Sequence, residues 1–162
     1  MNDDLGRKLN DYALKLLSFR PRSRKEITIR LIQYSKKNGI PQKEVDKIIS
    51  KLIRQNLIND EEFASWWIAQ RQSYKPKGKK IIELELKDKG VDSKIINKLL
   101  SNQNNFSESE FQSALNLAWK KYFIYKNYSK LEIKMKIANY LLRRGFTWET
   151  INRVIDSIMQ KA

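Results

Sequence analysis

The sequence predicts an all-α protein made of three tandem three-helix repeats, each like a helix-turn-helix, joined in an elongated array that is straight or curved. Glycine and proline are scarce, with 5 and 3 among 162 residues, so little interrupts the helices. Apolar residues recur every three or four positions along most of the chain, which is the spacing of one helix face. Three glycines also stand at equivalent places in a pattern that recurs about every 50 residues.

The repeat is centred on Gly39, Gly90 and Gly145, each of which is followed directly by an apolar residue. Glycine at this place suits the left-handed backbone that ends many helices. Apolar residues recur eight positions before each glycine and six and ten positions after it: Leu31, Val45 and Ile49; Ile82, Ile96 and Leu100; Ile137, Ile151 and Ile155. A single such glycine is an ordinary helix end, but matching offsets in three copies predict an internal repeat.

We divide the chain into residues 1–58, 59–103 and 104–162, each expected to form three helices and no strand. The polar stretch 101–105 is the expected flexible junction. Capping residues, which hydrogen-bond the free amides of a first helical turn, mark most of the helix starts. Capping boxes begin at Ser23, Ser107 and Ser129; Asn59, Asp92 and Thr147 mark further starts, and Pro41 stands just inside another.

The chain is strongly basic, with 33 Lys and Arg against 18 Asp and Glu and a net charge of +15 at pH 7. The excess is +8 in residues 1–58, +2 in residues 59–103 and +5 in residues 104–162. Such an excess favours a polyanionic partner, namely nucleic acid, an acidic membrane or an acidic protein. The alternative is that lysine-rich usage only increases solubility.

Cysteine and histidine are both absent. This removes disulfides, thiolate chemistry, the commonest general base and the commonest metal ligand. Asp60, Glu61 and Glu62 could bind Mg²⁺, but acidic residues in a first helical turn also complement the helix dipole, and we favour that role. No glycine-rich phosphate-binding loop is present. We therefore expect no enzyme activity, no cofactor and no metal.

Apolar runs are all shorter than the roughly 18 residues that a membrane helix needs. The first ten residues also lack the apolar core of a signal peptide. We therefore expect a cytoplasmic protein without a membrane partner.

Basic residues gather at two equivalent helix starts and again before Gly145. Cations at a helix start oppose the helix dipole, so helix stability does not explain them. We interpret them, together with the amides of the first turn, as a site for phosphate or carboxylate groups; a solvated loop is the alternative. The expected partner-binding residues are Arg20, Arg22, Arg24, Lys25, Arg71, Lys75, Lys77, Lys79, Lys80, Lys89, Arg143 and Arg144.

Tryptophans offer a second kind of contact, because indole rings can stack on bases. Trp66 lies off the main apolar stripe of its helix and is the better surface candidate. Trp67 is expected in the core, and Trp119 is open to either role.

These motifs resemble those of the RecX family, regulators of the RecA recombinase. The second repeat carries the family's Asp-Glu-x-Phe-Ala at 60–64, then Arg71, Gly78, and Ile-x-x-Glu-Leu-x-x-Lys-Gly-Val at 82–91. The first is similar to Arg-Pro-x-Ser-x-x-Glu-Leu at 20–27, with Ile in place of Leu, and the third ends like Leu-x-x-Arg-Gly-Phe at 141–146. Two departures stand out: Gly39 comes about four residues late, and Lys79 stands where family members often have proline.

The resemblance covers about residues 12–158 and implies an all-α monomer that lies along the deep groove of the RecA–DNA filament. There it would hinder strand exchange and ATP turnover or promote disassembly, and so modulate recombinational DNA repair and the SOS response. The expected partners are the RecA filament and, by weak and non-specific contact, single- or double-stranded DNA.

Two alternatives remain open from the residues. The helix pairs around the three glycines could form an independent DNA-binding protein that reads the major groove. The repeats could also form a scaffold for some other acidic protein.

Overall fold

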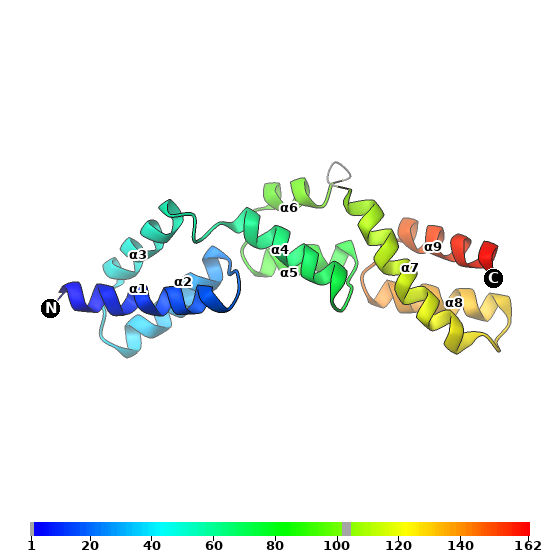
Figure 1. Cartoon of the computed structure of the whole chain (residues 1–162), viewed down its shortest axis with the longest axis horizontal. Helices are drawn as coiled ribbons and strands as arrows, with labels where there is room; N and C mark the ends of the chain where they lie inside the picture. Colours follow the sequence, from blue (N-terminus) through cyan, green and yellow to red (C-terminus); the bar gives the residue numbers. More distant parts are fainter. Residues whose placement is uncertain (1, 102–104) are drawn as a thin grey trace. The chain divides into compact units, whose positions relative to one another are not determined.

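The structure, a computed structural model, describes residues 2–101 and 105–162, except for the side chains of residues 2 and 3. Within these residues the chain is all-α and has no strand, which confirms the predicted fold class (Figure 1). The helices are α1 (Asn2–Phe19), α2 (Arg24–Lys37), α3 (Gln42–Arg54), α4 (Asp60–Ser73), α5 (Lys79–Asp88), α6 (Ser93–Leu99), α7 (Phe106–Tyr125), α8 (Lys130–Arg143) and α9 (Trp148–Lys161).

The described residues form two compact units. The N-terminal unit combines residues up to Trp66 with Lys87–Ile95, and the C-terminal unit combines Trp67–Leu86 with residues from Ile96 onward. The division falls inside α4, α5 and α6, so each of these helices contributes to both units. The predicted repeat boundaries after residues 58 and 103 stay a prediction.

The core of the N-terminal unit lies between α1, α2 and α3. Their apolar stripes, which the sequence places at helical spacing, face one another and exclude water. The buried side chains of this core are Leu9, Ala13, Ile27, Leu31, Ile40, Val45, Ile48, Ile49, Leu52 and Ile58.

The core of the C-terminal unit is built in the same way from α7, α8 and α9, with α7 packed against both of the others. Two alanines on α7 allow the helices to approach closely. The buried side chains are Ala114, Ala118, Ile133, Ile137, Leu141, Phe146, Ile151, Val154 and Ile158.

The three glycines of the repeat have the left-handed backbone that the sequence predicts, with φ of 64°, 78° and 86° at Gly39, Gly90 and Gly145. An L-residue with a side chain is strained in this conformation, so glycine is favoured there. The apolar residue after each glycine is buried, which folds the chain back onto the helix that has just ended.

Most of the predicted helix caps are confirmed. Ser23 and Ser129 each form a complete capping box, and Thr147 accepts a hydrogen bond from the amide of Thr150. Asn59 Oδ1 accepts hydrogen bonds from two first-turn amides of α4 at 3.0 and 3.1 Å, and Asp92 accepts one at the start of α6.

The capping box predicted at Ser107 is wrong, because α7 already begins at Phe106 and Glu110 binds elsewhere. Of the predicted junction 101–105, residues 102–104 lie outside the described residues. In the part of the chain that the structure describes, no helix is both long enough and apolar enough to cross a membrane.

Candidate functional site

The start of α2 carries the first predicted basic cluster, and it is organised by its capping box. Ser23 has an extended backbone, and its hydroxyl accepts a hydrogen bond from the Glu26 amide at 3.2 Å. The Glu26 carboxylate in turn accepts the Ser23 amide at 3.0 Å. Each side chain thus satisfies an amide that the first turn of a helix would leave unpaired.

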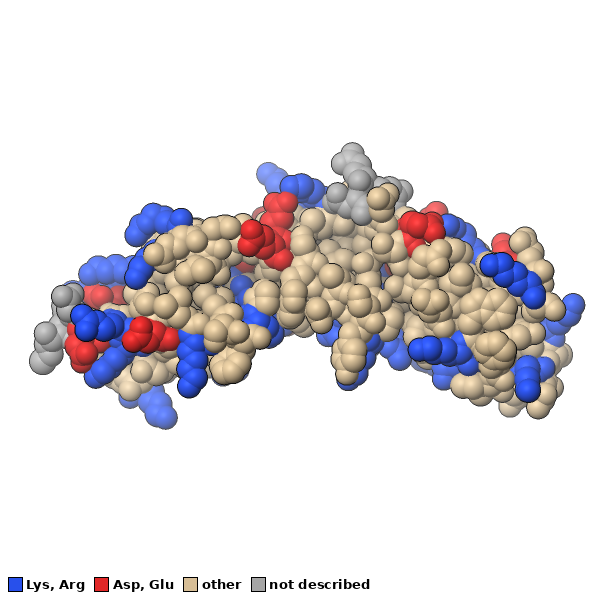
Figure 2. Space-filling view, viewed as in Figure 1, with Lys and Arg blue, Asp and Glu red and all other residues tan. Residues whose placement is uncertain are grey.

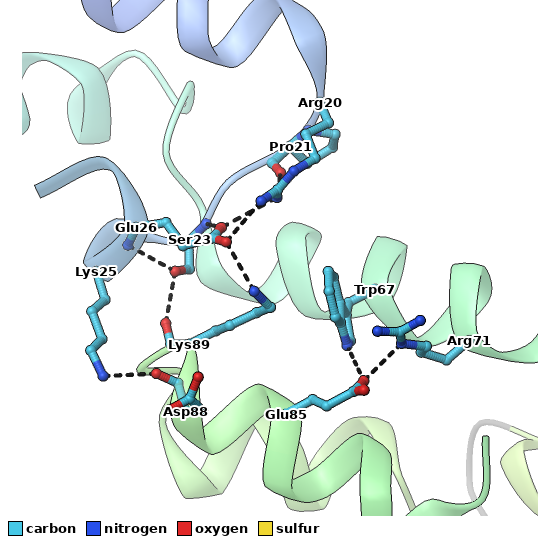
Figure 3. A network of polar contacts seen from close by, with 10 residues as sticks. All are labelled: Arg20, Pro21, Ser23, Lys25, Glu26, Trp67, Arg71, Glu85, Asp88 and Lys89. Atoms are coloured by element: carbon cyan, nitrogen blue, oxygen red, sulfur yellow. Dashed lines mark hydrogen bonds and ion pairs between the residues drawn. The ribbon is translucent and has the colours of Figure 1, made fainter. Parts of the chain in front are cut away.

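The Glu26 carboxylate also binds two of the predicted partner-binding cations (Figure 3). Arg20 Nη2 lies 2.9 Å and Lys89 Nζ 3.0 Å from Glu26 Oε1. Burial raises the pKa of Glu26, but the hydrogen bonds from Arg20, Lys89 and the Ser23 amide together outweigh it and lower the pKa to about 2. Glu26 is therefore ionised at neutral pH and holds both cations.

These bonds attach the start of α2 to the turn after α5. Ser23 Oγ donates to the Lys89 carbonyl at 2.7 Å, and Lys25 Nζ donates to the Asp88 carbonyl at 2.7 Å (Figure 3). Gly90 permits this approach, since an added Cβ there would lie 2.8 Å from Lys25 Cβ. The Arg24 amide donates to Asp60 Oδ1 at 2.8 Å. We call this set of bonds the α2 contact.

The start of α5 makes an equivalent contact with the turn after α8. The Gly78 amide donates to the Arg144 carbonyl at 2.8 Å, and the Lys80 amide donates to the Gly145 carbonyl at 3.2 Å. A Cβ added to Gly78 would overlap the backbone of Gly145 and Phe146. Arg144 Nη1 donates to the Pro76 carbonyl at 3.2 Å. We call this set of bonds the α5 contact.

A carboxylate from the following repeat completes both contacts. Asp60 of α4 accepts the first amide of α2, and Glu110 of α7 accepts the first amide of α5, Lys79 N, at 2.7 Å. Glu110 is only 4% exposed, and its other oxygen accepts a hydrogen bond from Thr150 Oγ1 at 3.0 Å. Asp60 thus pairs with a backbone amide, and within the described residues no acidic cluster could hold a metal.

Arg71 forms a third internal network, in the C-terminal unit. Its Nε donates to Glu85 Oε2 at 2.8 Å, and its guanidinium carbon lies 4.7 Å from the centre of the Trp67 ring. The Trp67 indole N–H donates to the same carboxylate oxygen at 2.8 Å (Figure 3). Trp67 is therefore half-buried, with its polar edge fully used.

Two of the other three tryptophans, Trp66 and Trp119, are also partly covered. Trp66 lies against Phe63, and Arg20 approaches its ring to 5.9 Å. Trp119 packs against the core of the C-terminal unit and touches Tyr122 and Phe123. Neither ring is the freely exposed stacking surface that Trp66 was expected to provide.

The predicted partner-binding residues therefore fall into two groups. Six have side chains engaged inside the protein: Arg20, Arg22, Lys25, Arg71, Lys89 and Arg144. The other six form no side-chain hydrogen bond or ion pair with any described residue: Arg24, Lys75, Lys77, Lys79, Lys80 and Arg143. Lys75 only approaches the ring of the neighbouring Tyr74, at 5.7 Å. Lys and Arg project over much of the face in Figure 2.

An open pocket of about 380 Å³ lies beside the α2 contact, lined by Arg20, Arg22, Glu26, Ile29, Arg30 and Gln33. Burial, together with the charges of Arg20 and Arg30, lowers the pKa of Arg22. Three guanidinium groups thus share this pocket with one carboxylate. The arrangement suits an incoming anionic group.

A further basic region escaped the sequence prediction. Residues 119–146, from α7 to the turn after α8, hold eight Lys and Arg, one acidic residue and seven aromatic residues. Only Arg143 and Arg144 of this region were among the predicted residues. The charge was counted over all of residues 104–162, where the acidic residues outside 119–146 conceal the local excess of cations. A count over residues 119–146 alone shows this excess.

Three family models match successive segments of the chain. They describe the first, second and third three-helix domains of RecX, and they match residues 11–52, 59–100 and 108–155. The predicted series of three tandem three-helix repeats is confirmed.

Curated relatives carry the same name. The chain is 30% identical over 149 residues to the regulatory protein RecX of Bacillus cytotoxicus, which covers 92% of this chain and 53% of that protein. It is 30% identical over 138 residues to the one from Mycobacterium sp. strain JLS, covering 84% of this chain and 73% of that protein. The chain spans about half the length of the Bacillus relatives it matches.

Solved structures agree. The crystal structure of RecX from Lactobacillus salivarius matches with a TM-score of 0.83 and 29% identity, over 98% of this chain and 99% of that one. A second crystal structure, of a regulatory protein RecX, matches with a TM-score of 0.74 and 25% identity, over 96% of this chain and 73% of that one. On these matches, the chain belongs to the RecX family of regulatory proteins.

Proposed function

We propose that this chain regulates a RecA-type recombinase by binding along the groove of the RecA–DNA filament and inhibiting ATP hydrolysis and strand exchange. In the cell this would modulate recombinational DNA repair and the SOS response. The observation that carries the proposal is membership of the RecX family across all three repeats. Because the chain spans about half of several relatives, the proposal concerns what these three repeats do.

The six basic side chains that form no hydrogen bond or ion pair with a described residue are the proposed contacts with filament carboxylates and DNA phosphates. They come from the starts of α2 and α5 and from the end of α8, so every repeat contributes at least one. The engaged cations act indirectly, by fixing the loops that carry the free ones.

A periodic partner suits a repeat protein. Each repeat can make a weak contact with a successive subunit of the filament, and linked weak contacts add through effective concentration. This mode of binding requires no catalysis, cofactor or metal, and a cytoplasmic monomer suffices. Direct contact with DNA phosphate supplies a sequence-independent share of the affinity.

The test is to add the protein to preformed RecA filaments and to measure ATP hydrolysis and strand exchange. We expect both rates to fall as the protein approaches saturation of the filament. Unchanged rates at several-fold excess over filament subunits would reject the proposal.

Two matched triple variants locate the contacts. Replacing Arg24, Lys80 and Arg143 by Gln removes three exposed proposed contacts, and we expect inhibition to weaken and to become less sensitive to salt. Replacing Lys15, Lys43 and Lys161 by Gln removes the same charge from exposed positions outside the proposed site. Equal weakening by both triple variants would show that net charge alone is responsible.

Experiments on the same purified protein test the two alternative functions, an independent DNA-binding protein and a scaffold for another acidic protein. A footprint at particular duplex sequences without RecA would favour an independent DNA-binding protein. In a pull-down from cell lysate, recovery of one dominant acidic protein other than RecA would favour a scaffold.

A further inference from the structure

The most basic and aromatic region of the chain runs from the second half of α7 to the turn after α8. Its eight cations and single acid, Glu132, lie among seven aromatic residues. Aromatic rings interleaved with cations are typical of surfaces that bind single-stranded nucleic acid. This composition alone does not define a binding site. The positions of the side chains show whether the rings and cations lie together.

Three tyrosines along the α7–α8 seam each have a cation against the ring. Lys136 Nζ lies 4.5 Å from the ring centre of Tyr128 and 5.5 Å from that of Tyr125. The two rings meet edge to face, with centres 6.1 Å apart and planes at 84°. One cation thus serves a pair of rings near the loop between α7 and α8.

The row continues along the seam. Lys121 Nζ lies 4.7 Å and Arg144 Cζ 5.4 Å from the ring centre of Tyr140. Lys136 and Tyr140 are four residues apart on α8, and Arg144, the residue that caps its end, follows four residues later. The three therefore form one line that faces Lys121 and Tyr125 on α7. We call Tyr125, Tyr128 and Tyr140, with Lys121, Lys136 and Arg144, the tyrosine track.

The track leads directly to the basic loop before α5. Arg144 at its end donates to the Pro76 carbonyl, and this loop presents Tyr74, which is 69% exposed and has Lys75 at 5.7 Å from its ring centre. Lys75, Lys77 and Lys80 add three cations without an internal ion pair among the described residues. Rings and cations therefore alternate from the α7–α8 loop to the start of α5, all within the C-terminal unit.

Glu132, the single acidic residue of segment 119–146, offsets little of this charge. Hydrogen bonds from the Ser129 hydroxyl and amide, followed by the charge of Lys136, lower the pKa of Glu132. Glu132 is thus ionised at neutral pH, but it already caps α8. The surrounding Lys120, Lys126, Lys130 and Lys134 are all exposed and keep the surface strongly positive.

We propose that the tyrosine track binds single-stranded nucleic acid, with bases stacked on the tyrosine rings and phosphates bound by the lysines, while Arg144 positions Tyr140 and the loop at Pro76. Tyr128 is 47% exposed and is the ring most open to a base, while Tyr125 and Tyr140 are half-buried against the core of the C-terminal unit and present only part of their rings. Paired bases in a duplex are already stacked and cannot use the rings. An acidic peptide would use the cations but gain little from three rings. An anionic membrane would favour the exposed Leu131 and Met135 over the track.

The experiment is fluorescence anisotropy of a fluorescein-labelled oligothymidylate titrated with the full chain, without recombinase and over a series of salt concentrations. We expect binding that weakens with salt. Tyr128→Leu should weaken it about fivefold or more, the usual loss when one stacking ring is removed. Lys136→Gln should reduce the slope of log affinity against log salt by roughly 0.7, the value for one phosphate contact on a single strand.

Controls separate the track from general charge and exposure. Phe19→Leu removes a 72% exposed ring, and Lys43→Gln an exposed cation, both from the N-terminal unit; each should bind as the wild type does. Circular dichroism confirms that each variant is folded. The same titration with a labelled oligouridylate shows whether the track binds RNA or DNA more tightly.

The proposal is overturned if the wild type does not bind the oligonucleotide, or if Tyr128→Leu and Lys136→Gln bind it as tightly as the wild type. It is also overturned if duplex of equal length or anionic vesicles compete as well as the single strand. None of these outcomes depends on RecA, so the proposed regulation of the filament stands or falls separately.

Discussion

The start of α2 and the start of α5 occupy equivalent places in successive repeats, yet different chemistry holds each of them. At α2, side-chain charges make the contact: Glu26 binds Arg20 and Lys89, and Lys25 binds the Asp88 carbonyl. At α5, backbone groups make it, because Gly78 lets the chain approach the turn at Gly145 directly.

The difference decides which cations remain for a partner. The α2 contact needs Arg20, Lys25 and Lys89 for its own stability. The α5 contact uses only backbone groups of the basic loop, namely amides and the Pro76 carbonyl, so it leaves the side chains of Lys75, Lys77 and Lys80 available. The same position in the repeat is therefore a structural joint in one place and a candidate binding surface in the other.

Gly78→Ala should have the largest effect on stability. The added methyl group overlaps the backbone of Gly145 and Phe146, which cannot rotate away as a side chain can, so we expect a loss of about 3 kcal/mol in the free energy of unfolding. Gly39→Ala is the control. It has a strained φ of 64° but open space around the added atom, and should cost about 1 kcal/mol. Equal losses for both variants in urea unfolding would contradict the close approach at Gly78.

Glu26→Gln should come next. It removes the negative charge that Arg20 and Lys89 both bind, for an expected loss of about 2 kcal/mol in the free energy of unfolding. Glu132→Gln alters an otherwise identical capping box that lies in the solvent, and should change stability much less. A similar loss for both, again in urea unfolding, would mean that Glu26 acts only as a cap.

The effect of pH should be smaller and confined to acid. The pKa of Glu26 is about 2 in the folded protein, below its usual value of 4.5, so its stabilising effect is fully present above about pH 4.5. That effect is lost as the pH falls toward 2, where the folded carboxyl is protonated. Between pH 5 and pH 3, the free energy of unfolding should fall more for the wild type than for Glu26→Gln. Parallel losses in the two proteins would rule out a lowered pKa.

Local features of this fold could be read from the sequence, whereas long-range contacts could not. The capping boxes at Ser23 and Ser129 and the left-handed glycines depend on residues close in the chain, and all were predicted. The bond from Ser23 to Lys89 joins residues 66 positions apart, so no local pattern reveals it. The basic residues near Ser23 were therefore interpreted as free when several are paired.

The wrong cap at Ser107 has the same cause. Ser107 and Glu110 have the spacing of a capping box, but Glu110 pairs with the amide of Lys79 and the hydroxyl of Thr150, which lie far away in the sequence. The tyrosine track likewise depends on how α7 and α8 face each other. Sequence shows the residues of such a surface, and the pairing of helices decides which of them meet.

Two sets of charge-neutralising variants test most directly whether the cations divide into those that stabilise the fold and those that bind a partner. One set replaces Lys75, Lys77 and Lys80 by Gln. The other set replaces Arg20 and Lys89 by Gln. Melting temperature and inhibition of RecA filament ATP hydrolysis would be measured on both, well below the melting temperature. We predict that the first set loses inhibition and keeps its melting temperature, while the second melts earlier and still inhibits. The reverse pattern, or equal loss of inhibition in both sets, would contradict the account.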